Sequence, residues 1–279
     1  NTILGPALGG VRIWNYINES KALEDVLRLS RGMSFKAAIS GLDLGGGKAV
    51  IIGDNKTKKT KIFMRKFGEF VNSLGGKYIT AKDVGRTTED MKHVRMETKY
   101  VTGIPKSMGG SGDPSHVTAY GVYMGMKAAA KYRWGTDNLD NKTILVQGIG
   151  HVGKNLVNYL TKEGANVIIN DINLERLEQI ATRFGAKIVK NDSIYDIDID
   201  IYAPCALGSV LTPSTISSLK CSVVAGAANN QLSNEDRDGK LLALRNIVYA
   251  PDFLINAGGL INVANELEGY NRQRAFDQA

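Results

Sequence analysis

Cysteine and histidine are scarce in this sequence. Its 279 residues include two cysteines, Cys205 and Cys221, and three scattered histidines. The cysteines show no CxxC spacing and have no companion cluster of histidines, so the pattern excludes the usual zinc site and a disulfide framework. We therefore expect no bound metal. Two reduced thiols of this kind favour a cytoplasmic protein.

Long apolar runs are also missing. No stretch reaches the ~20 apolar residues that a membrane-spanning helix needs, and no charged-then-apolar signal peptide opens the chain. We therefore expect no membrane partner. The chain has no starting methionine and begins directly at Asn1, which suggests a processed chain or a fragment.

Dense blocks of like charge are rare as well. The formal net charge is +7, yet the one dense run of cations is Lys56–Lys61, which we interpret as a solvated surface turn. Acidic residues are interleaved almost everywhere else. A basic balance of this kind bears on solubility and association more than on function, so we expect no nucleic-acid partner. A mild positive field could instead help to collect anionic substrates.

Length predicts two domains. At 279 residues the chain is long for one hydrophobic core. The glycine-rich stretch Ser107–Ser115, which includes Pro114, interrupts all regular structure and gives the clearest boundary signal. We expect one domain over residues 1–114 and a second over residues 115–279. A helix that Ser115 caps would open the second.

The first domain is predicted to mix strands and helices. Apolar residues at helical spacing indicate a helix over about residues 20–30, capped by Ser20. Lys48–Ile52 predicts a short strand, and residues 62–74 predict an amphipathic helix. A further strand at KYIT would deliver Asp83 to a strand end.

From Asn141 onward, strands and helices alternate. KTILVQ predicts a buried strand, a helix follows to about Glu163, and NVIIND and LERLEQIATRFG repeat the pattern. Further short strands are expected in KIV, DIDIYAP, SVVAGAA and IVYAP. This alternation predicts an α/β fold with a parallel sheet that helices cover on both faces.

The turn after the first of these strands has a dinucleotide-binding pattern. GIGHVG, from Gly148 to Gly153, follows the strand TILVQ and opens a helix, which is the context that G-x-G-x-x-G requires. Gly148 would permit the tight turn, Gly150 a close approach of the backbone to a pyrophosphate, and Gly153 close packing of helix and strand. The pyrophosphate charge would then lie at the helix N-terminus. A glycine-rich turn in a nucleotide-free α/β domain is the alternative.

An acidic residue after the next strand indicates which dinucleotide binds. Asp171 stands eighteen positions after Gly153. It would accept hydrogen bonds from the adenosine ribose hydroxyls and repel a 2′-phosphate. No arginine or lysine follows it immediately, because the next three residues are Ile172, Asn173 and Leu174. The sequence therefore favours NAD over NADP.

A lysine among glycines is the strongest sign of catalysis. In LGGGKAVI, Lys48 follows three glycines at the start of an apolar stretch. An ammonium in such a cleft loses water, which disfavours its charged form and favours its use as a base. Lys36 in GMSFK and Asp83 in TAKDVG complete a set that suggests an enzyme. Either lysine alone could be a surface cation, and Asp83 could be a helix cap.

An ordered set of motifs resembles the family of glutamate, leucine, phenylalanine and valine dehydrogenases, and leucine dehydrogenases most closely. The motifs are GPALGG, GMSFK, LGGGKAVI, TAKDVG, TAYGV, GIGHVG, YAPCALG, GAANNQL and INAGGLINVANE. This resemblance implies an N-terminal α/β substrate and catalytic domain followed by a Rossmann-type, doubly wound NAD-binding domain. It also implies a homo-oligomer that catalyses the NAD-dependent, reversible oxidative deamination of an L-amino acid to a 2-oxo acid and ammonia.

The resemblance implies a role for each matched residue. Lys36 would bind the substrate carboxylate, Lys48 would activate the water that attacks the imine carbon, and Asp83 would carry protons to and from the amino group. The substrate site would further include Gly9, Gly10, Met33, Leu8, Ala81, Leu260 and Val263. The cofactor would contact Gly148, Gly150, His151, Val152, Gly153, Asp171, Thr118, Ala206, Asn230 and Asn256.

Three of the cofactor residues would lie near the nicotinamide. Thr118 would touch its amide, and Asn230 and Asn256 would lie near its ribose and the substrate. His151 stands where the family more usually has asparagine. Its side chain should point away from the phosphates, so we do not expect it to be catalytic.

Leu8 predicts an apolar substrate. Glutamate dehydrogenases carry a lysine at its place in the motif GPxKGG, where the lysine pairs with the distal carboxylate. A carboxylate buried against Leu8 without a partner would cost about several kcal/mol, so glutamate should be rejected. Leu260 stands where leucine dehydrogenases more often have valine, a change that alters discrimination by only ~1–3 kcal/mol. Leucine, isoleucine and valine are the first choice, and phenylalanine or tryptophan stays open.

Two other functions stay open at this point. One is an aromatic amino-acid dehydrogenase, and the other is a non-catalytic NAD-binding homologue, which would be expected to have lost Lys48 or Asp83. Family members usually extend beyond both ends of this chain. A first strand and helix, and a C-terminal helical segment that returns to the first domain, are not recognised in this sequence, and whether the chain is complete or a fragment stays open.

Overall fold

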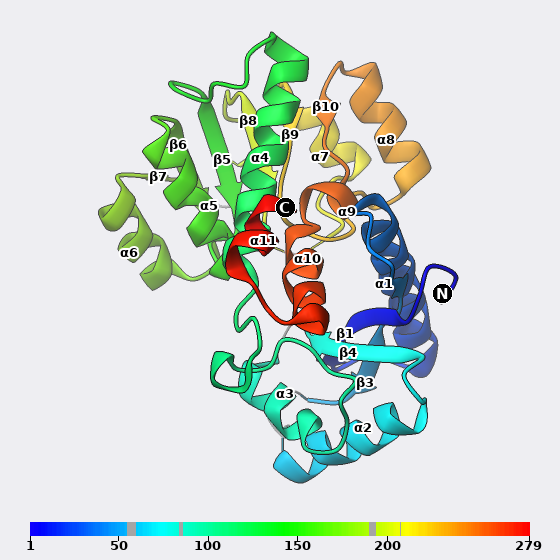
Figure 1. Ribbon diagram of the computed structural model, residues 1–279. Helices are drawn as coiled ribbons and strands as arrows, with labels where there is room; N and C mark the ends of the chain where they lie inside the picture. Colours follow the sequence, from blue (N-terminus) through cyan, green and yellow to red (C-terminus); the bar gives the residue numbers. More distant parts are fainter. Residues whose placement is uncertain (55–59, 84–85, 190–193, 207) are drawn as a thin grey trace. The chain divides into compact units, whose positions relative to one another are not determined.

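The computed structural model describes residues 1–54, 60–83, 86–189, 194–206 and 208–279 (Figure 1). Most of the cationic run that was predicted to form a surface turn, residues 55–59, lies outside them. Contacts between residues divide the chain into two units. Unit 1 comprises residues 1–114 and 259–278, and unit 2 comprises residues 115–258 with Ala279.

Unit 1 is built on a parallel sheet of four strands. Its elements are β1 (Ala7–Trp14), α1 (Glu19–Ile39), β2 (Gly45–Gly46), β3 (Ala49–Ile52), α2 (Lys61–Ser73), β4 (Tyr78–Lys82), α3 (Thr88–Arg95), the short helix η1 (Lys106–Met108), and, from the end of the chain, α10 (Gly258–Ala264), η3 (Asn265–Glu268) and α11 (Arg272–Asp277). Strand β1 lies at the centre, with β4 along one side and β2 followed by β3 along the other.

Alternation along β1 divides its side chains between two apolar clusters. Leu8 packs with Ala37 of α1 and with residues of α10, whereas Val11 packs with Met64 of α2 and Met91 of α3. Successive side chains of a strand point to opposite faces. One face of the sheet is therefore covered by α1 and α10, and the other by α2 and α3.

Helix α1 is longer than predicted and begins earlier. Asn18, rather than Ser20, is its N-cap, because the Asn18 side chain accepts a hydrogen bond of 2.9 Å from the backbone N–H of Lys21. The helix continues past Ser30 to Ile39 because its apolar face continues through Leu29, half-buried Met33 and Ala37.

The last part of the chain differs from the predicted domain division. Residues 259–278, expected in the second domain, make their contacts in unit 1. Leu260 and Val263 of α10 join the cluster around Leu8. Glu266 of η3 then accepts hydrogen bonds from the backbone N–H groups of Gly103 (2.9 Å) and Ser111 (2.8 Å). Burial raises the pKa of Glu266, although these donors act against that rise. The segment therefore completes the core of unit 1.

Unit 2 is a six-stranded parallel sheet between two layers of helices. Its elements are α4 (Ser115–Trp134), β5 (Thr143–Gln147), α5 (His151–Lys162), β6 (Asn166–Asn170), α6 (Leu174–Phe184), β7 (Lys187–Ile188), β8 (Ile201–Pro204), α7 (Pro213–Ser218), β9 (Val223–Val224), α8 (Glu235–Leu244), β10 (Val248–Tyr249) and α9 (Asp252–Ile255). Each strand predicted from Asn141 onward is present, and the predicted α/β class is confirmed.

The strand order of unit 2 is that of a doubly wound dinucleotide-binding fold. From one edge to the other it runs β7-β6-β5-β8-β9-β10, so the chain reverses direction across the sheet between β5 and β8 (Figure 1). Ile144 and Val146 of β5 face the core under α4, α5 and α6, whereas Leu145 faces the core with α7 and α8. In such sheets, ligands bind outside the carboxyl ends of the strands at this reversal.

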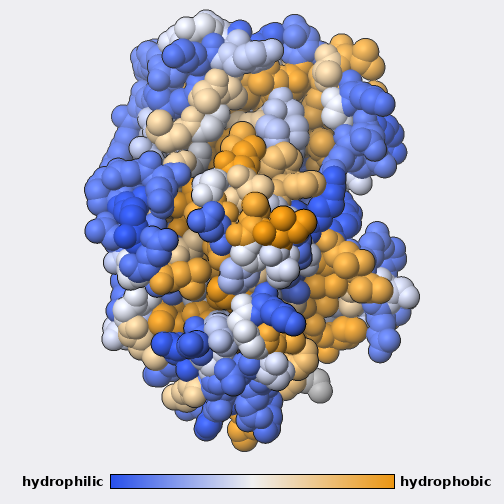
Figure 2. Space-filling model, turned by 45° about the vertical axis from the view of Figure 1, so that its right-hand side comes forward, coloured by the Kyte–Doolittle hydropathy of each residue, from blue (hydrophilic) through white to orange (hydrophobic). Residues whose placement is uncertain are grey.

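The face of the chain drawn in Figure 2 carries both polar and apolar areas. Polar residues cover much of the face in Figure 2, with apolar patches between them. On unit 1 the exposed apolar side chains include Leu23 and Leu27 of α1, and Trp14 and Ile52, which are paired across β1 and β3. Among the described residues, no helix is long and apolar enough to cross a membrane.

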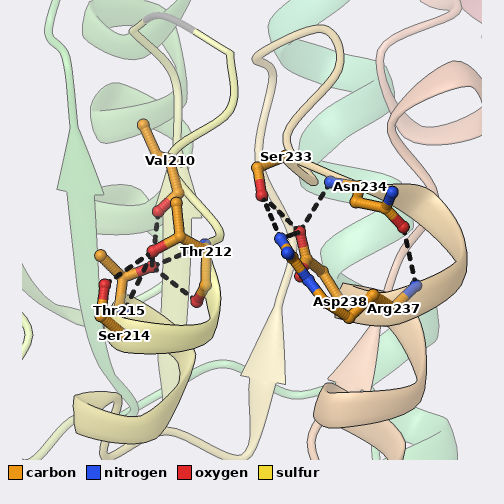
Figure 3. A network of polar contacts seen from close by, with 8 residues as sticks. All are labelled: Val210, Thr212, Ser214, Thr215, Ser233, Asn234, Arg237 and Asp238. Atoms are coloured by element: carbon orange, nitrogen blue, oxygen red, sulfur yellow. Dashed lines mark hydrogen bonds and ion pairs between the residues drawn. The ribbon is translucent and has the colours of Figure 1, made fainter.

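Two polar networks fix the starts of α7 and α8 (Figure 3). Thr212 and Thr215 form a reciprocal capping box at α7. At α8, the fully buried carboxylate of Asp238 accepts hydrogen bonds from Ser233 Oγ (2.6 Å) and Asn234 N (2.7 Å), and it pairs with Arg237 Nε (2.7 Å). Burial alone would raise the pKa of Asp238, but these donors lower it.

We predict that Asp238→Asn lowers the free energy of unfolding by about 1–3 kcal/mol at neutral pH. The groups that donate to the carboxylate would then face an amide, which has one acceptor oxygen instead of two. A carboxyl group whose pKa is lower in the folded protein than in the unfolded chain stabilises the folded state. This contribution is fully present above the pKa of the unfolded chain, and it is lost as the pH falls through the pKa of the folded protein. The stability of the variant should therefore fall less steeply on acidification. Urea denaturation at several pH values measures both effects.

The matched control is Asp236→Asn, in the exposed first turn of the same helix. It should change stability by no more than about 0.5 kcal/mol. Equal stability of the two variants at pH 7 would contradict the role given to Asp238.

Candidate active site

Lys48 lies at an interruption of the sheet in unit 1. Strands β2 and β3 run along the same side of β1 in one register, and Lys48 stands between them at the level of Gly10. Only 6% of its side chain is exposed. The structure thus places a desolvated amine at this position, as the glycines and the apolar stretch around it predict.

Lys48 pairs with Asp83 across β1. Asp83 follows β4 on the other side of β1, and its Oδ2 lies 3.0 Å from Lys48 Nζ. Gly10 leaves the space between them, because a Cβ atom there would lie 2.8 Å from Asp83 Cβ. Two charges withdrawn from water need such a partner, since an unpaired one is costly. The pair can hold a proton and pass it on.

Arg12, which the sequence motifs do not single out, belongs to the same cluster. Its Nε donates to Asp83 Oδ2 at 3.2 Å, and its Nη1 lies 3.0 Å from Asp25 Oδ2 on α1. The Tyr16 hydroxyl donates to the same oxygen of Asp25. Strand periodicity could have found Arg12, because it stands two residues after Gly10 and hence on the same face of β1.

The surroundings shift the pKa values of this cluster. Burial lowers the pKa of the Arg12 guanidinium, but Asp83 and Asp25 outweigh that effect, so the pKa is raised overall. Burial and the hydrogen bond to Asp25 raise the pKa of Tyr16 to about 12. Both groups therefore keep their protons at neutral pH, with Arg12 as a fixed positive charge.

Most of the predicted substrate residues gather on the same face of the sheet. Leu8, Leu260 and Val263 belong to one buried cluster, and Met33 packs against it. Ala81 is buried on β4 directly beside Gly10. The register and the alternation of the strands give this face to Leu8, Gly10 and Ala81.

Two further residues of the predicted substrate site are Lys36 on α1 and Gly9 on β1. Lys36 is half-buried on α1, one turn after Met33. A Cβ atom at Gly9 would lie 1.6 Å from the Gly47 carbonyl oxygen and 3.3 Å from Met33 Cγ. Gly9 therefore serves the close packing of β1 against the glycine-rich segment.

The glycine-rich turn of unit 2 lies at the reversal of strand order. Gly148 has φ +93°, and a Cβ atom at Gly153 would lie 2.0 Å from the Gly148 carbonyl oxygen. A Cβ atom at Gly150 would meet no atom within 4 Å. No side chain caps the start of α5 at Gly150. Open space in front of uncapped N–H groups suits an anion such as a pyrophosphate.

Asp171 contacts this turn directly. Its Oδ2 accepts a hydrogen bond of 2.8 Å from Ile149 N, and its Oδ1 accepts one of 2.9 Å from Asn173 N. Arg176 Nη1 lies 3.7 Å from Asp171 Oδ2. Arg176 is not among the three residues directly after Asp171, and it comes near Asp171 because it lies in the first turn of α6.

The other predicted cofactor residues follow the carboxyl ends of neighbouring strands. Ala206 follows β8 and lies against Gly148, whose added Cβ atom would meet Ala206 Cβ at 2.6 Å. His151 is exposed at the first position of α5, and the Val152 side chain packs into the core. A cofactor contact from Val152 would therefore use its backbone N–H.

Asn256 leaves one polar atom without a partner. Its Nδ2 donates to Ala227 O and to Asn229 Oδ1, both at 2.9 Å, whereas its buried Oδ1 has no hydrogen-bond partner. Asn230, with φ +50°, lies next to Asn229. Thr118 lies nearby on α4, since a Cβ atom at Gly258 would be 3.2 Å from Thr118 Cα. Such an oxygen is a ready acceptor for a ligand amide or hydroxyl.

Neither metal nor thiol chemistry finds support in the part of the chain that the structure describes. It contains no group of three or more His, Cys, Asp or Glu side chains that could hold a metal ion. Cys205 and Cys221 are free, and burial raises the pKa of each thiol to about 12. Both thiols are therefore protonated at neutral pH and are poor nucleophiles.

Both parts of the chain match models of one protein family. Residues 1–100 match the model described as Glu/Leu/Phe/Val dehydrogenase, dimerisation domain. Residues 109–173 and 169–278 match the model described as Glutamate/Leucine/Phenylalanine/Valine dehydrogenase.

Individual relatives agree with these matches. The chain is 57% identical to the leucine dehydrogenase of Thermoactinomyces intermedius, over 99% of this chain and 75% of that protein. It is also 57% identical to the leucine dehydrogenase of Bacillus subtilis (strain 168), over 99% and 76%. Among solved structures, L-tryptophan dehydrogenase from Nostoc punctiforme has a TM-score of 0.83 and 46% identity, over 100% of this chain and 80% of that one.

The two glycines of the turn give a matched test. Gly150→Ala adds a methyl group to open space, so the variant should fold normally. It should bind NADH at least about tenfold more weakly, because the methyl group would keep the pyrophosphate away from the backbone of the turn. Gly153→Ala should destabilise the fold, because its methyl group would overlap the Gly148 carbonyl. Thermal melting and fluorescence titration with NADH measure the two effects, and unchanged NADH affinity in Gly150→Ala would contradict the assignment of this site.

Proposed function

This chain belongs to the Glu/Leu/Phe/Val dehydrogenase family, and we propose that it catalyses the reversible, NAD-dependent oxidative deamination of L-leucine and other branched-chain amino acids. The products are the 2-oxo acid and ammonia. Relatives that are 57% identical over nearly the whole chain carry the name leucine dehydrogenase, which supports this choice of reaction and substrate.

The buried ion pair of Lys48 and Asp83 is the observation that carries this proposal. Oxidative deamination needs a base for the substrate ammonium and a base for the water that replaces nitrogen. An amine and a carboxylate 3.0 Å apart, with exposed side-chain fractions of 6% and 13%, can perform both tasks. A homologue that only bound NAD would have no need to bury both charges.

The proton transfers follow from these positions. Asp83 accepts a proton from the substrate ammonium, which frees the nitrogen lone pair to form the C=N bond. When bound, NAD supplies the acceptor for the hydride that leaves the α-carbon. Lys48, after giving up its own proton, takes a proton from the water that attacks the imine carbon, which gives a carbinolamine. Asp83 returns its proton to the nitrogen and then accepts the hydroxyl proton as the C–N bond breaks, so that ammonia leaves and the 2-oxo acid forms. Lys36 binds the substrate carboxylate as a compact cation.

The apolar cluster around Leu8 supports an aliphatic substrate. Leu8, Leu260 and Val263 are each at most 6% exposed, and Met33 packs beside them. None of these side chains can pair with a second carboxylate. An unpaired carboxylate among them would cost about several kcal/mol, so glutamate is rejected.

The turn of unit 2 supports NAD as the cofactor. The start of α5, which no side chain caps, would hold the pyrophosphate, and Asp171 would accept hydrogen bonds from the adenosine ribose. The open space beside Gly150 and the partnerless oxygen of Asn256 fit such a ligand. Arg176, 3.7 Å from Asp171, makes the comparison of NAD with NADP a necessary measurement.

The protein acts as a homo-oligomer in the cytoplasm. The match of residues 1–100 to a dimerisation domain and the exposed apolar side chains Leu23, Leu27 and Trp14 of unit 1 support self-association. The two free, protonated thiols fit a reducing compartment.

An aromatic amino-acid dehydrogenase is the second candidate function. The similarity to L-tryptophan dehydrogenase, at 46% identity over the whole chain, favours it. The size of Leu260 alone does not decide between leucine and an aromatic substrate, because one methylene is worth only ~1–3 kcal/mol of discrimination. Initial rates with leucine, phenylalanine and tryptophan separate the two functions.

A substrate panel on the wild type and on Lys48→Ala tests the proposal. NADH formation at 340 nm is followed with leucine, valine, phenylalanine, tryptophan and glutamate, with NAD and with NADP. We expect leucine and NAD to give the highest kcat/KM and glutamate to give none. In Lys48→Ala, kcat should fall by about 10²–10⁴-fold, the range for general acid–base catalysis, while NADH binding is retained.

Lys66→Ala, which removes an exposed lysine on α2, is the control and should behave like the wild type. The proposal is wrong if the wild type binds NADH yet oxidises none of these amino acids. A Lys48→Ala variant with full activity would remove Lys48 from the mechanism.

A further inference from the structure

Two cations meet on one oxygen atom of Asp83. Lys48 Nζ lies 3.0 Å and Arg12 Nε 3.2 Å from Asp83 Oδ2. The two donors come from different segments, since Lys48 precedes β3 and Arg12 lies within β1. The carboxylate is thus held from two directions, and only one of its two cations belongs to the proposed chemistry.

Arg12 is itself held from the far side. Its Nη1 lies 3.0 Å from Asp25 Oδ2, and the Tyr16 hydroxyl donates to that same oxygen. The Arg12 side chain is 19% exposed and that of Asp25 is 28% exposed. Its guanidinium therefore spans two carboxylates, and α1 is joined through it to the face of the sheet that carries Asp83.

We propose that Arg12 is a positioning residue, which fixes the carboxylate of Asp83 for proton transfer while Asp25 and Tyr16 fix the guanidinium. This inference rests on the proposed function, because it assigns Arg12 a task in that reaction. Arg12 need not touch the substrate, and it acts through Asp83.

The need for a second cation follows from the reaction. Lys48 must turn from Asp83 to a water molecule when that water attacks the imine carbon. Once Asp83 has returned its proton to the nitrogen it is again a buried charge, and without Arg12 it would have one cation fewer beside it, which is unfavourable. With Arg12 in place, the carboxylate keeps a partner and its orientation throughout. Arginine suits this task because its fork of donors can bridge two carboxylates, which an ammonium cannot do with fixed geometry.

The charges of the cluster also balance. Lys48 and Arg12 supply two positive charges, and Asp83 and Asp25 supply two negative ones. Tyr78 of β4 also senses Asp83, which contributes to the raised pKa of that tyrosine after burial, the larger cause. Removing the Arg12 charge would take one cation away from Asp83. A carboxylate that loses a neighbouring cation is protonated more readily.

Three variants test this inference in the full chain. Arg12→Met removes both contacts, Arg12→Lys keeps the charge but cannot bridge both carboxylates, and Asp25→Asn leaves Arg12 without its anchor. We expect kcat for leucine to fall by about 10²-fold in Arg12→Met, the scale for a misplaced catalytic group. Arg12→Lys should recover part of that loss, and Asp25→Asn should lose less than Arg12→Met.

The pH profile gives a readout that a merely structural role would not move. The acidic limb of kcat/KM should shift to higher pH in Arg12→Met, because Asp83 would be protonated more readily. In Arg12→Lys the limb should stay near that of the wild type. NADH affinity, measured by fluorescence, should be unchanged in all three variants.

Unit 1 offers two matched controls. Glu24→Gln changes an exposed carboxylate that pairs with Lys21 and stands next to Asp25 in the sequence. Arg65→Met removes an arginine of α2 that pairs with Glu97. Both should keep the wild-type kcat and pH profile. Melting curves show whether each variant is folded, and if Arg12→Met does not fold, Arg12→Lys and Asp25→Asn still decide the matter.

The outcomes separate this inference from the proposed function. If the wild type oxidises leucine but folded Arg12 and Asp25 variants keep its kcat and acidic limb, Arg12 has no positioning role and the proposed function stands. If kcat falls without any shift of the limb, and Arg12→Lys recovers nothing, Arg12 supports the fold only. If the wild type oxidises no amino acid, both fail together.

Discussion

The ion pair between Lys48 and Asp83 is the interaction on which the proposed chemistry of unit 1 depends. Two opposite charges are largely removed from water there, and this is tolerable only because they lie 3.0 Å apart. Their approach in turn requires Gly10, the residue of β1 over which they meet. Gly10 of the GPALGG motif therefore leaves room for a lysine and an aspartate from opposite sides of β1 to meet, whereas Gly9 allows close packing of β1 against the glycine-rich segment.

Much of this could be predicted from local sequence. Strand and helix periodicity located the elements of unit 2, and the glycine spacing identified a turn that lies at the reversal of its strand order. The desolvated position of Lys48 was also predictable, because glycines and an apolar stretch surround it. These features depend on residues close together in the chain, where spacing alone determines which side chains share a face.

Other features were not predictable because they depend on residues far apart in sequence. Arg12 reaches Asp83 over 71 positions, and α10 returns to the cluster around Leu8 from the other end of the chain. The start of α1 was misplaced because Ser20 resembles a cap, whereas Asn18 makes the capping hydrogen bond, and its length was underestimated because the helix continues past Ser30 to Ile39. Arg176 was overlooked since it stands two positions beyond the residues considered. Strand periodicity gives the face of β1 on which Arg12 lies, but no local pattern gives its partner 71 positions away.

The central claim is that Lys48 and Asp83 act as one proton-transfer unit, and a double-mutant cycle on kcat tests it most directly. The wild type, Lys48→Ala, Asp83→Asn and the double variant are compared at one pH with saturating leucine and NAD. Residues that act as a unit show strongly non-additive effects, so the double variant should be within about tenfold of the slower single variant. If the two losses multiply instead, the residues act independently and the claim is contradicted.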